Sequence, residues 1–207
     1  MSNKGSVLIL SAPSGSGKTS LAYRVLPRLS NLRFSVSHTT RKRRRGEENG
    51  REYFFVSTSE FEEMIRRDAF LEWANVYGNY YGTSRDFVQT QIDAGIDVLL
   101  DIDIQGALKV KELVPEAVMI FVMPPSFDEL EARLRGRGLD DEDVIERRLQ
   151  IARDEIQHFR RYDFVIINRE LEQSVAELMA VITASRCRVG RRQEQAERIE
   201  RTFHAAR

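Results

Sequence analysis

Short apolar runs alternate with amphipathic stretches along most of the chain, a pattern typical of an α/β fold. Continuous apolar runs at residues 7–10 and 98–100 favour strands covered on both faces, as in a parallel sheet, although a short buried helix has the same pattern. The predicted strands are residues 7–11, 34–37, 98–102, 119–123 and 164–167. The predicted helices are residues 18–29, 104–113, 126–135, 141–159 and 171–185.

Residues 38–95 depart from this alternation, and a small, partly antiparallel subdomain inserted into the parallel sheet is the simplest account. The elements expected there are strands at 53–56 and 71–76 and a helix at 57–67, with turns at Gly46, Gly50, Gly78 and Gly82. Elsewhere, Ser126 followed by Glu129 predicts a capping box at the start of a helix. From residue 186 the chain carries seven arginines and is expected to form a basic, peripheral helix. Three roles stay open for it: packing against a second subunit, a solvated surface, or contact with nucleic acid.

The composition narrows the classes of protein. With 207 residues, 32 basic and 32 acidic side chains and 42% hydrophobic residues, the chain suits one soluble globular domain. No apolar run approaches the ~20 residues that span a bilayer, so a cytoplasmic protein without a membrane partner is expected. The zero net charge argues against a dedicated nucleic-acid-binding protein. The single Cys187 forms no intrachain disulfide, and three scattered histidines offer no zinc site.

The segment between the first predicted strand and helix matches the Walker A template, G-x-x-x-x-G-K-[ST], except at its first position. Its residues, all candidates to bind ATP, are Ala12, Pro13, Ser14, Gly15, Ser16, Gly17, Lys18 and Thr19. Gly15 and Gly17 let successive amides point inward as an anion nest, and the following helix adds its N-terminal donors. Lys18 is expected between the β- and γ-phosphates, with the Thr19 hydroxyl available to Mg²⁺. Ala12 weakens the match without removing this chemistry.

Two classes of P-loop protein compete for this segment. Residues 103–106 (DIQG) fit the D-x-x-G of a switch GTPase, but residues 168–171 (NREL), the nearest candidate for its guanine-reading N-K-x-D, lack the aspartate. A kinase whose acceptor is itself a phosphate needs extra cations to hold two anions together. The basic run at 41–45 and the arginines at 133–148, beside Gly136 and Gly138 of a mobile lid, supply them. The kinase interpretation is therefore favoured.

Several long motifs, in the same order and with similar spacing, resemble guanylate kinases from about residue 6 to residue 184. They are residues 34–41 (FSVSHTTR), 46–55 (GEENGREYFF), 72–74 (EWA), 78–83 (GNYYGT) and 100–106 (LDIDIQG). The resemblance implies a P-loop kinase with a five-stranded parallel sheet flanked by helices, within a domain of residues 5–185. Its parts would be a core (5–37, 96–125 and 156–185), a mixed-β GMP-binding subdomain (38–95), a helical lid (126–155) and, outside the family core, a basic tail (186–207).

The resemblance also implies a role for individual residues. The GMP phosphate would be held by Arg41, Arg44, Tyr53 and Tyr81. Guanine would be recognised by Ser37, Glu72 and Thr83, with support from Asp103. The transferring phosphoryl group would be clamped by Arg133, Arg137 and Arg148, which form the catalytic set together with Lys18 and Arg41. Mg²⁺ would be held by Thr19 and, through water, by Asp101. Thr83 stands where the family often has serine but keeps the hydroxyl.

The implied reaction, ATP + GMP (or dGMP) → ADP + GDP, agrees with elementary chemistry. One ionised carboxylate at Glu72 can accept hydrogen bonds from both guanine N1–H and the exocyclic amino group. Adenine presents an acceptor at N1, so a buried polar site of this kind discriminates against it by a factor of roughly 10⁴ or more. The acceptor oxygen is already ionised, so no general base is needed, and closure over both nucleotides is expected to exclude water. Two alternatives remain: a non-catalytic scaffold with this fold, and a kinase for a phosphorylated sugar.

Overall fold

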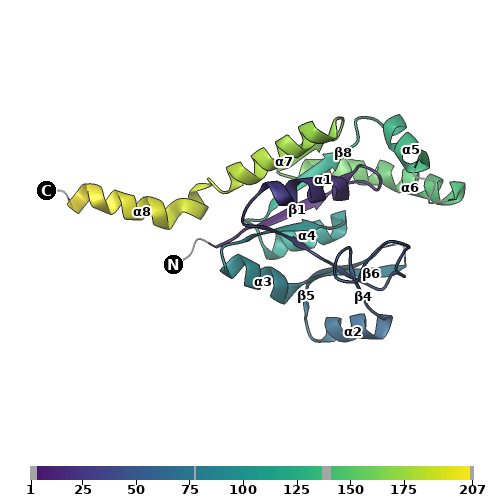
Figure 1. The fold of residues 1–207 in the computed structure, drawn as a ribbon, viewed down its shortest axis with the longest axis horizontal. Helices are drawn as coiled ribbons and strands as arrows, with labels where there is room; N and C mark the ends of the chain where they lie inside the picture. The colour runs from purple at the N-terminus through teal and green to yellow at the C-terminus, as the bar shows by residue number, and fades with distance from the viewer. Residues whose placement is uncertain (1–3, 77, 137–140, 206–207) are drawn as a thin grey trace.

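In the computed structural model, which describes residues 4–76, 78–136 and 141–205, five parallel strands form the central sheet (Figure 1). In sheet order these are β2 (Leu32–Ser35), β7 (Asp97–Asp101), β1 (Val7–Ser11), β8 (Val118–Met123) and β9 (Phe164–Ile167). Since β1 lies between β7 and β8, the chain leaves it in one direction along the sheet and later returns on its other side. Open parallel sheets bind ligands at the carboxyl ends of their strands beside such a reversal.

Helices cover both faces of this sheet (Figure 1). Alternate side chains of β1 enter different cores: Leu8 and Leu10 join the layer that includes α1 (Lys18–Val25) and α7 (Leu171–Ser185), whereas Val7 and Ile9 join the layer that includes α3 (Arg85–Asp93) and α4 (Ile104–Leu113). A strand buried on both faces needs apolar residues at every position, which explains the continuous apolar run at 7–10. The predicted fold class is confirmed.

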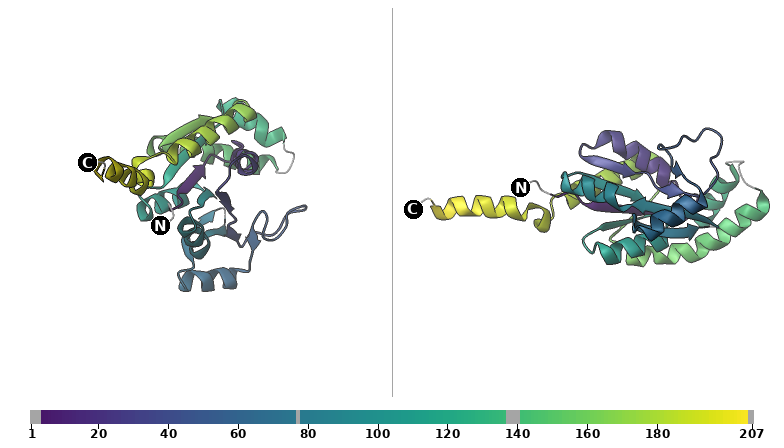
Figure 2. Two further views of the ribbon diagram at one scale, coloured as in Figure 1. Left: turned by 60° about the vertical axis from the view of Figure 1, so that its left-hand side comes forward. Right: turned by 90° about the horizontal axis from the view of Figure 1, so that it is seen from below.

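A smaller mixed sheet is inserted between β2 and α3. Its order is β4 (Phe54–Phe55), β3 (His38–Thr39), β6 (Asn79–Ser84) and β5 (Phe70–Val76), with parallel pairing between β3 and β4 and antiparallel pairing elsewhere. Helix α2 (Thr58–Arg66) packs on it and begins with a complete capping box between Ser57 and Glu60. Figure 2 shows this unit to one side of the main sheet.

Two further helical segments extend from the main sheet. Helices α5 (Phe127–Gly136) and α6 (Glu142–Glu155) pack against each other through their own apolar cluster, and the 3₁₀ helix η2 (Ile156–Arg161) leads back to β9. At the opposite end of the molecule, α8 (Val189–Ala205) projects away from the body (Figures 1 and 2). Within the described residues no helix is long and apolar enough to cross a membrane.

Several predicted boundaries are wrong for local reasons. The first predicted helix ends at Val25 rather than at residue 29. The 3₁₀ turn η1 (Leu26–Arg28) follows it, because Pro27 lacks the amide hydrogen that would continue the helix. The helix predicted at 141–159 ends at Glu155. The strand predicted at 34–37 is instead Leu32–Ser35, because it pairs with β7 from Leu32 onward, immediately after Asn31 turns with a φ of 54°.

Residues 38–95 hold elements that the sequence pattern did not predict, namely β3 and β6 of the smaller sheet and α3, which packs on the main sheet. Gly82 was expected at a turn but lies within β6, where a Cβ atom would come within 2.8 Å of the Phe70 ring and 2.9 Å of the Phe61 ring. The glycine is therefore needed for packing. Gly46, Gly50 and Gly78 have positive φ angles, as turn glycines do.

Candidate active site

The phosphate loop joins β1 to α1, and both of its glycines are required by its geometry. Gly15 and Gly17 have φ angles of 98° and 88°, a conformation that L side chains rarely adopt. A Cβ atom at Gly17 would also lie 2.4 Å from Nδ2 of Asn168, which donates a 2.7 Å hydrogen bond to the carbonyl oxygen of Ser16. The loop is therefore stabilised by the side chain of Asn168, directly after β9, as well as by its own backbone conformation.

Lys18 and Thr19, the last residues of the Walker motif, both contact Asp101 at the carboxyl end of β7. The Lys18 ammonium lies 2.5 Å from Oδ1 of Asp101 and donates to the carbonyl oxygen of Ile102 at 2.9 Å. The Thr19 hydroxyl donates to Oδ2 of the same carboxylate at 2.9 Å. A cation, a hydroxyl and a carboxylate therefore meet beside the anion nest.

The basic run at residues 41–45 begins with a side chain that is held firmly in place. Arg41 donates to Glu47 at 2.7 Å, and its guanidinium lies over the rings of Tyr53 at 5.3 Å and Phe55 at 5.7 Å. Tyr81 packs edge-on against Tyr53. Burial, with Asp101 and Tyr81 nearby, raises the pKa of the Tyr53 phenol, so this group stays a hydrogen-bond donor at neutral pH. Arg44, by contrast, is exposed.

Glu72 is the most deeply buried acidic side chain of the site, with 6% of its surface exposed. Its Oε1 accepts a 2.6 Å hydrogen bond from the hydroxyl of Thr83, which is itself fully buried. Burial raises the pKa of Glu72 to about 7; the Thr83 hydrogen bond opposes the rise and the neighbouring Asp103 adds to it. Asp103 caps helix α4 by accepting from the Gly106 amide at 2.8 Å.

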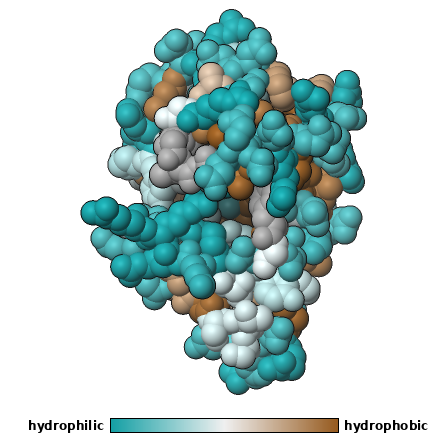
Figure 3. Space-filling model, turned by 90° about the vertical axis from the view of Figure 1, so that its right-hand side faces the viewer, coloured by the Kyte–Doolittle hydropathy of each residue, from teal (hydrophilic) through white to brown (hydrophobic). Residues whose placement is uncertain are grey.

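One cleft of about 440 Å³ brings these groups together. Figure 3 shows a hollow between the α5–α6 region above and the smaller sheet below, rimmed mainly by hydrophilic side chains. The predicted site residues that line the cleft are all eight of the phosphate loop together with Ser37, Arg41, Arg44, Tyr53, Glu72, Tyr81, Asp101, Asp103 and Arg148. The acidic pocket of Glu72 and the phosphate loop thus face the same space.

The remaining predicted residues have other placements. Thr83 lies behind Glu72 and donates to it. Arg133, on α5, donates to the carbonyl oxygen of Asn168 at 3.0 Å and lies 3.4 Å from Oε2 of Glu129. Arg137 lies outside the described residues. Of the capping box predicted at Ser126, the structure shows the bond to the serine, whose hydroxyl accepts from the Glu129 amide at 3.1 Å.

Among the residues of the site region that were not predicted, three bear on its chemistry. Glu155, at the end of α6, lines the cleft, and burial raises its pKa to about 7 although Lys18 opposes the rise. Glu47 lies in the quoted motif 46–55, but only the structure shows that it holds Arg41. Asn168 had been weighed only as part of a GTPase motif; its buried position against the phosphate loop could not be found from local sequence.

A parallel sheet of this order, with a Walker-type loop after β1 and an aspartate at the end of β7, defines a P-loop protein of the kinase type. The guanylate kinase family model matches residues 4–185. The guanylate kinase of Neisseria gonorrhoeae is 52% identical over 188 residues, covering 91% of this chain and 92% of that protein. The guanylate kinase of Dechloromonas aromatica is 51% identical, covering 87% and 90% respectively.

The structural comparison agrees. The crystal structure of guanylate kinase from Anaplasma phagocytophilum superimposes with a TM-score of 0.79 at 36% identity, covering 92% of this chain and 90% of that one. The chain belongs to the guanylate kinase family, whose members are nucleoside monophosphate kinases. The family resemblance stated from the sequence motifs is confirmed.

Proposed function

We propose that this protein transfers the γ-phosphoryl group of Mg-ATP to GMP or dGMP, giving ADP and GDP or dGDP for purine nucleotide metabolism. The observation that carries the proposal is the buried carboxylate of Glu72, which opens onto the same cleft as the phosphate loop and Arg41. An ionised carboxylate there matches the adjacent N1–H and amino donors of guanine. We include dGMP because the proposed contacts are to the base and the phosphate, which GMP and dGMP share.

The acceptor phosphate is assigned to Arg41, Arg44, Tyr53 and Tyr81. Arg41 is preorganised by Glu47 and by two aromatic rings, so little side-chain entropy remains to be lost when an anion binds. Exposed Arg44 is free to swing onto the phosphate as the cleft closes. Because the attacking phosphate oxygen is already ionised, these residues need only position it and neutralise its charge.

The donor phosphates are assigned to the phosphate loop, with Lys18 at the β- and γ-phosphates. Arg133, Arg137 and Arg148 would stabilise the charge on the transferring group. The hydroxyl of Thr19 and the carboxylate of Asp101, 2.9 Å apart, are the hard oxygen ligands that Mg²⁺ prefers, so the residues present fit this ion. Thr19 would hold it directly and Asp101 through water. When bound, Mg²⁺ would offset the negative charge on the phosphate oxygens.

The test is an acceptor panel in a coupled assay of ADP release, with GMP, dGMP, AMP, CMP, UMP and ribose bisphosphate offered separately beside Mg-ATP. We expect turnover with GMP and dGMP and at least about 10³-fold lower kcat/KM with the other acceptors. A flat trace from correctly folded protein would favour a non-catalytic scaffold. Turnover of ribose bisphosphate instead would favour a sugar kinase.

We further propose that α8 pairs with a second copy of itself. One face of this projecting helix carries the exposed side chains of Val189, Ile199 and Phe203. In an antiparallel pair centred on Ala196, the helical spacing would bring Val189 of each helix to Phe203 of the other, and Arg192 to Glu200. Sedimentation is expected to show a dimer that Phe203→Glu dissociates; a monomeric parent protein would contradict this.

A further inference from the structure

Gly106 lies in the first turn of α4, beside the Glu72 carboxylate. A Cβ atom built on Gly106 would lie 2.6 Å from Oε2 of Glu72 and 3.0 Å from Oδ1 of Asp103. The first of these distances is shorter than real Cβ contacts. The φ angle of Gly106 is not in the left-handed region, so backbone conformation does not require glycine here. Space for the carboxylate is the remaining reason.

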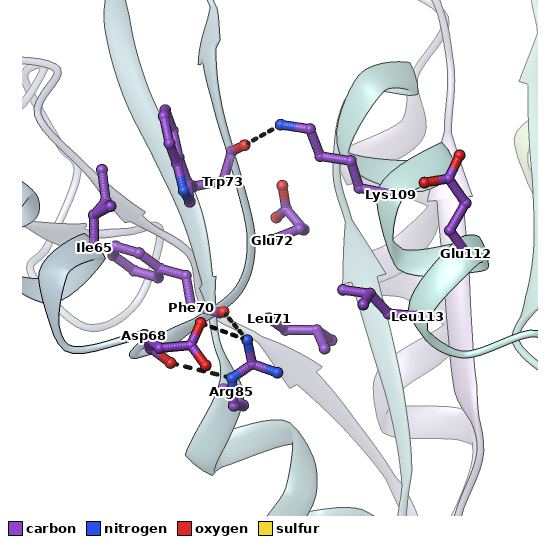
Figure 4. A pocket seen from close by; sticks show the side chains of 10 residues that line it. All are labelled: Ile65, Asp68, Phe70, Leu71, Glu72, Trp73, Arg85, Lys109, Glu112 and Leu113. Carbon is purple, nitrogen blue, oxygen red and sulfur yellow. Dashed lines mark hydrogen bonds and ion pairs between the residues drawn. The ribbon is translucent and has the colours of Figure 1, made fainter.

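The carboxylate of Glu72 is held on its other sides. Its Oε1 accepts the 2.6 Å hydrogen bond from Thr83, and the strand that carries it is tied to α4 by Lys109, whose ammonium donates to the carbonyl oxygen of Trp73 at 2.8 Å. Figure 4 shows Glu72 between β5 and α4, with Lys109 reaching across to Trp73. A methyl group at residue 106 would therefore displace the carboxylate from its bond to Thr83 or turn it within the cleft.

We propose that Gly106 is a positioning residue for guanine recognition: by lacking a side chain it lets helix α4 approach β5 while leaving Glu72 free to face the base. This inference rests on the proposed function of the cleft. The same missing side chain leaves Asp103 able to cap α4 through the Gly106 amide. Gly106 thus controls discrimination between guanine and bases that lack its amino group, without touching the nucleotide.

The effect of Gly106→Ala on the fold is separable from its effect on the site. Alanine is the better helix former, and the atom it would meet first is the far end of a flexible side chain. The gain in helix propensity offsets part of the loss of the Thr83 hydrogen bond, so we expect the variant to fold with little change in Tm. The displaced carboxylate is expected to weaken GMP binding by at least about tenfold while ATP binding changes by less than about twofold, since ATP does not contact Glu72.

The experiment measures the binding of GMP, IMP and Mg-ATP separately by titration calorimetry. IMP is GMP without the exocyclic amino group, so the preference for GMP over IMP reports on the carboxylate directly. We expect this preference to fall by about tenfold in Gly106→Ala. Gly190→Ala is the matched control, because Gly190 is also helical, in α8, and a Cβ atom there would meet nothing within 4 Å.

A double-mutant cycle with Glu72→Gln tests whether Gly106 acts through that carboxylate. If it does, adding Gly106→Ala to Glu72→Gln costs little further GMP affinity. Fully additive losses would overturn the inference, as would unchanged GMP binding, an equal loss of GMP and ATP, or an unfolded Gly106→Ala protein. A parent protein that fails to bind GMP would instead refute the proposed function, before any variant is made.

Discussion

Glu72 and Glu155 line one cleft, and burial raises the pKa of each carboxyl group to about 7, yet their neighbours differ. At Glu155 the charge of Lys18, which favours the ionised form, outweighs that of Asp103, whereas at Glu72 the like charge of Asp103 outweighs that of Lys109 and the Thr83 hydroxyl is the main stabilising contact. Glu72 therefore lacks a full counter-charge of its own. Two guanine N–H donors would supply the missing stabilisation, so this buried carboxylate is better satisfied with the ligand than without it.

The first prediction concerns pH. Because the pKa of Glu72 in the free protein is about 7, the carboxyl group is increasingly protonated below that pH, and its protonated form cannot accept both guanine hydrogen bonds. GMP affinity is thus expected to be full above about pH 8 and to fall by about tenfold per unit as the pH drops below 7. Calorimetric titration of GMP from pH 5.5 to 8.5 measures this dependence.

The control separates Glu72 from other titrating groups. In Glu72→Gln the side chain at residue 72 does not titrate, so GMP binding is weaker and its pH profile should lack the step near pH 7. The steps that remain come from the GMP phosphate, which titrates near pH 6, and from Glu155. An identical profile in both proteins would mean that Glu72 does not recognise the base.

The second prediction concerns Lys18, whose ammonium contacts Asp101 and the Ile102 carbonyl. Lys18→Ala removes the positive charge that we assign to the donor phosphates. We expect kcat to fall by about 10²–10³ while the circular dichroism spectrum and Tm change little. Lys4→Ala, at an exposed lysine paired with Asp93, is the control and should keep full activity. Equal losses in both variants would contradict the assignment.

The two ends of the main sheet carry different groups: residues of the candidate site lie at one end and a buried ion-pair network lies at the other. The carboxyl ends of β1 and β7 carry the phosphate loop and Asp101, whereas the start of β7 carries Asp97, which is 1% exposed. The Asp97 carboxylate accepts from the Ser6 amide at 2.8 Å, from Arg186 at 2.7 Å and from Arg191 at 2.6 Å. This buried network joins the start of β7 to the end of α7 and the start of α8, far from the cleft.

The third prediction follows from this network. Asp97→Ala leaves two partly buried guanidinium groups without their anion, so we expect the free energy of unfolding to fall by about 3 kcal/mol. Urea denaturation measures the change, and Asp93→Ala, at an exposed pair, should lower the free energy of unfolding far less. Activity per folded molecule should be unchanged; a loss of kcat in stable Asp97→Ala protein would show that the network reaches the cleft.

The molecule as a whole places the two halves of the site on different units. The phosphate loop belongs to the main sheet, Glu72 and Arg41 to the smaller sheet and its loops, and Arg148 to α6. A cleft of about 440 Å³ between them admits water, which weakens every electrostatic contact with the phosphates. Movement of these units toward one another would exclude that water and bring the arginines onto the transferring group.

The fourth prediction is therefore compaction. Small-angle scattering should show a smaller radius of gyration with GMP and a non-hydrolysable ATP analogue together than with either alone, because only the pair supplies anions on both sides of the cleft. Replacing GMP by CMP, which lacks the guanine donors, is the matched control and should leave the protein open. An unchanged radius with both nucleotides would refute closure.

Much of this architecture could be predicted from local pattern. A doubly buried strand must be apolar at every position, and a phosphate loop must have glycines before its lysine, so β1, β7, β9 and the Walker segment were located correctly. Helices α4 and α7 were predicted to the residue for a similar reason: their apolar spacing matches the face they bury. Each of these features can be recognised because the residues that determine it lie within about a dozen positions of one another.

The rest depends on contacts between distant segments. β6 and Gly82 were misread because the reason for a glycine there is the pair of rings from Phe61 and Phe70, which approach only in the folded chain. The closeness of Gly106 to Glu72, and of Asn168 to the phosphate loop, depends in the same way on how a helix and a strand end pack. Local sequence specifies which groups are present and on which elements they lie. Packing between elements decides which groups meet and how deeply they are buried, and burial in turn shifts their pKa values.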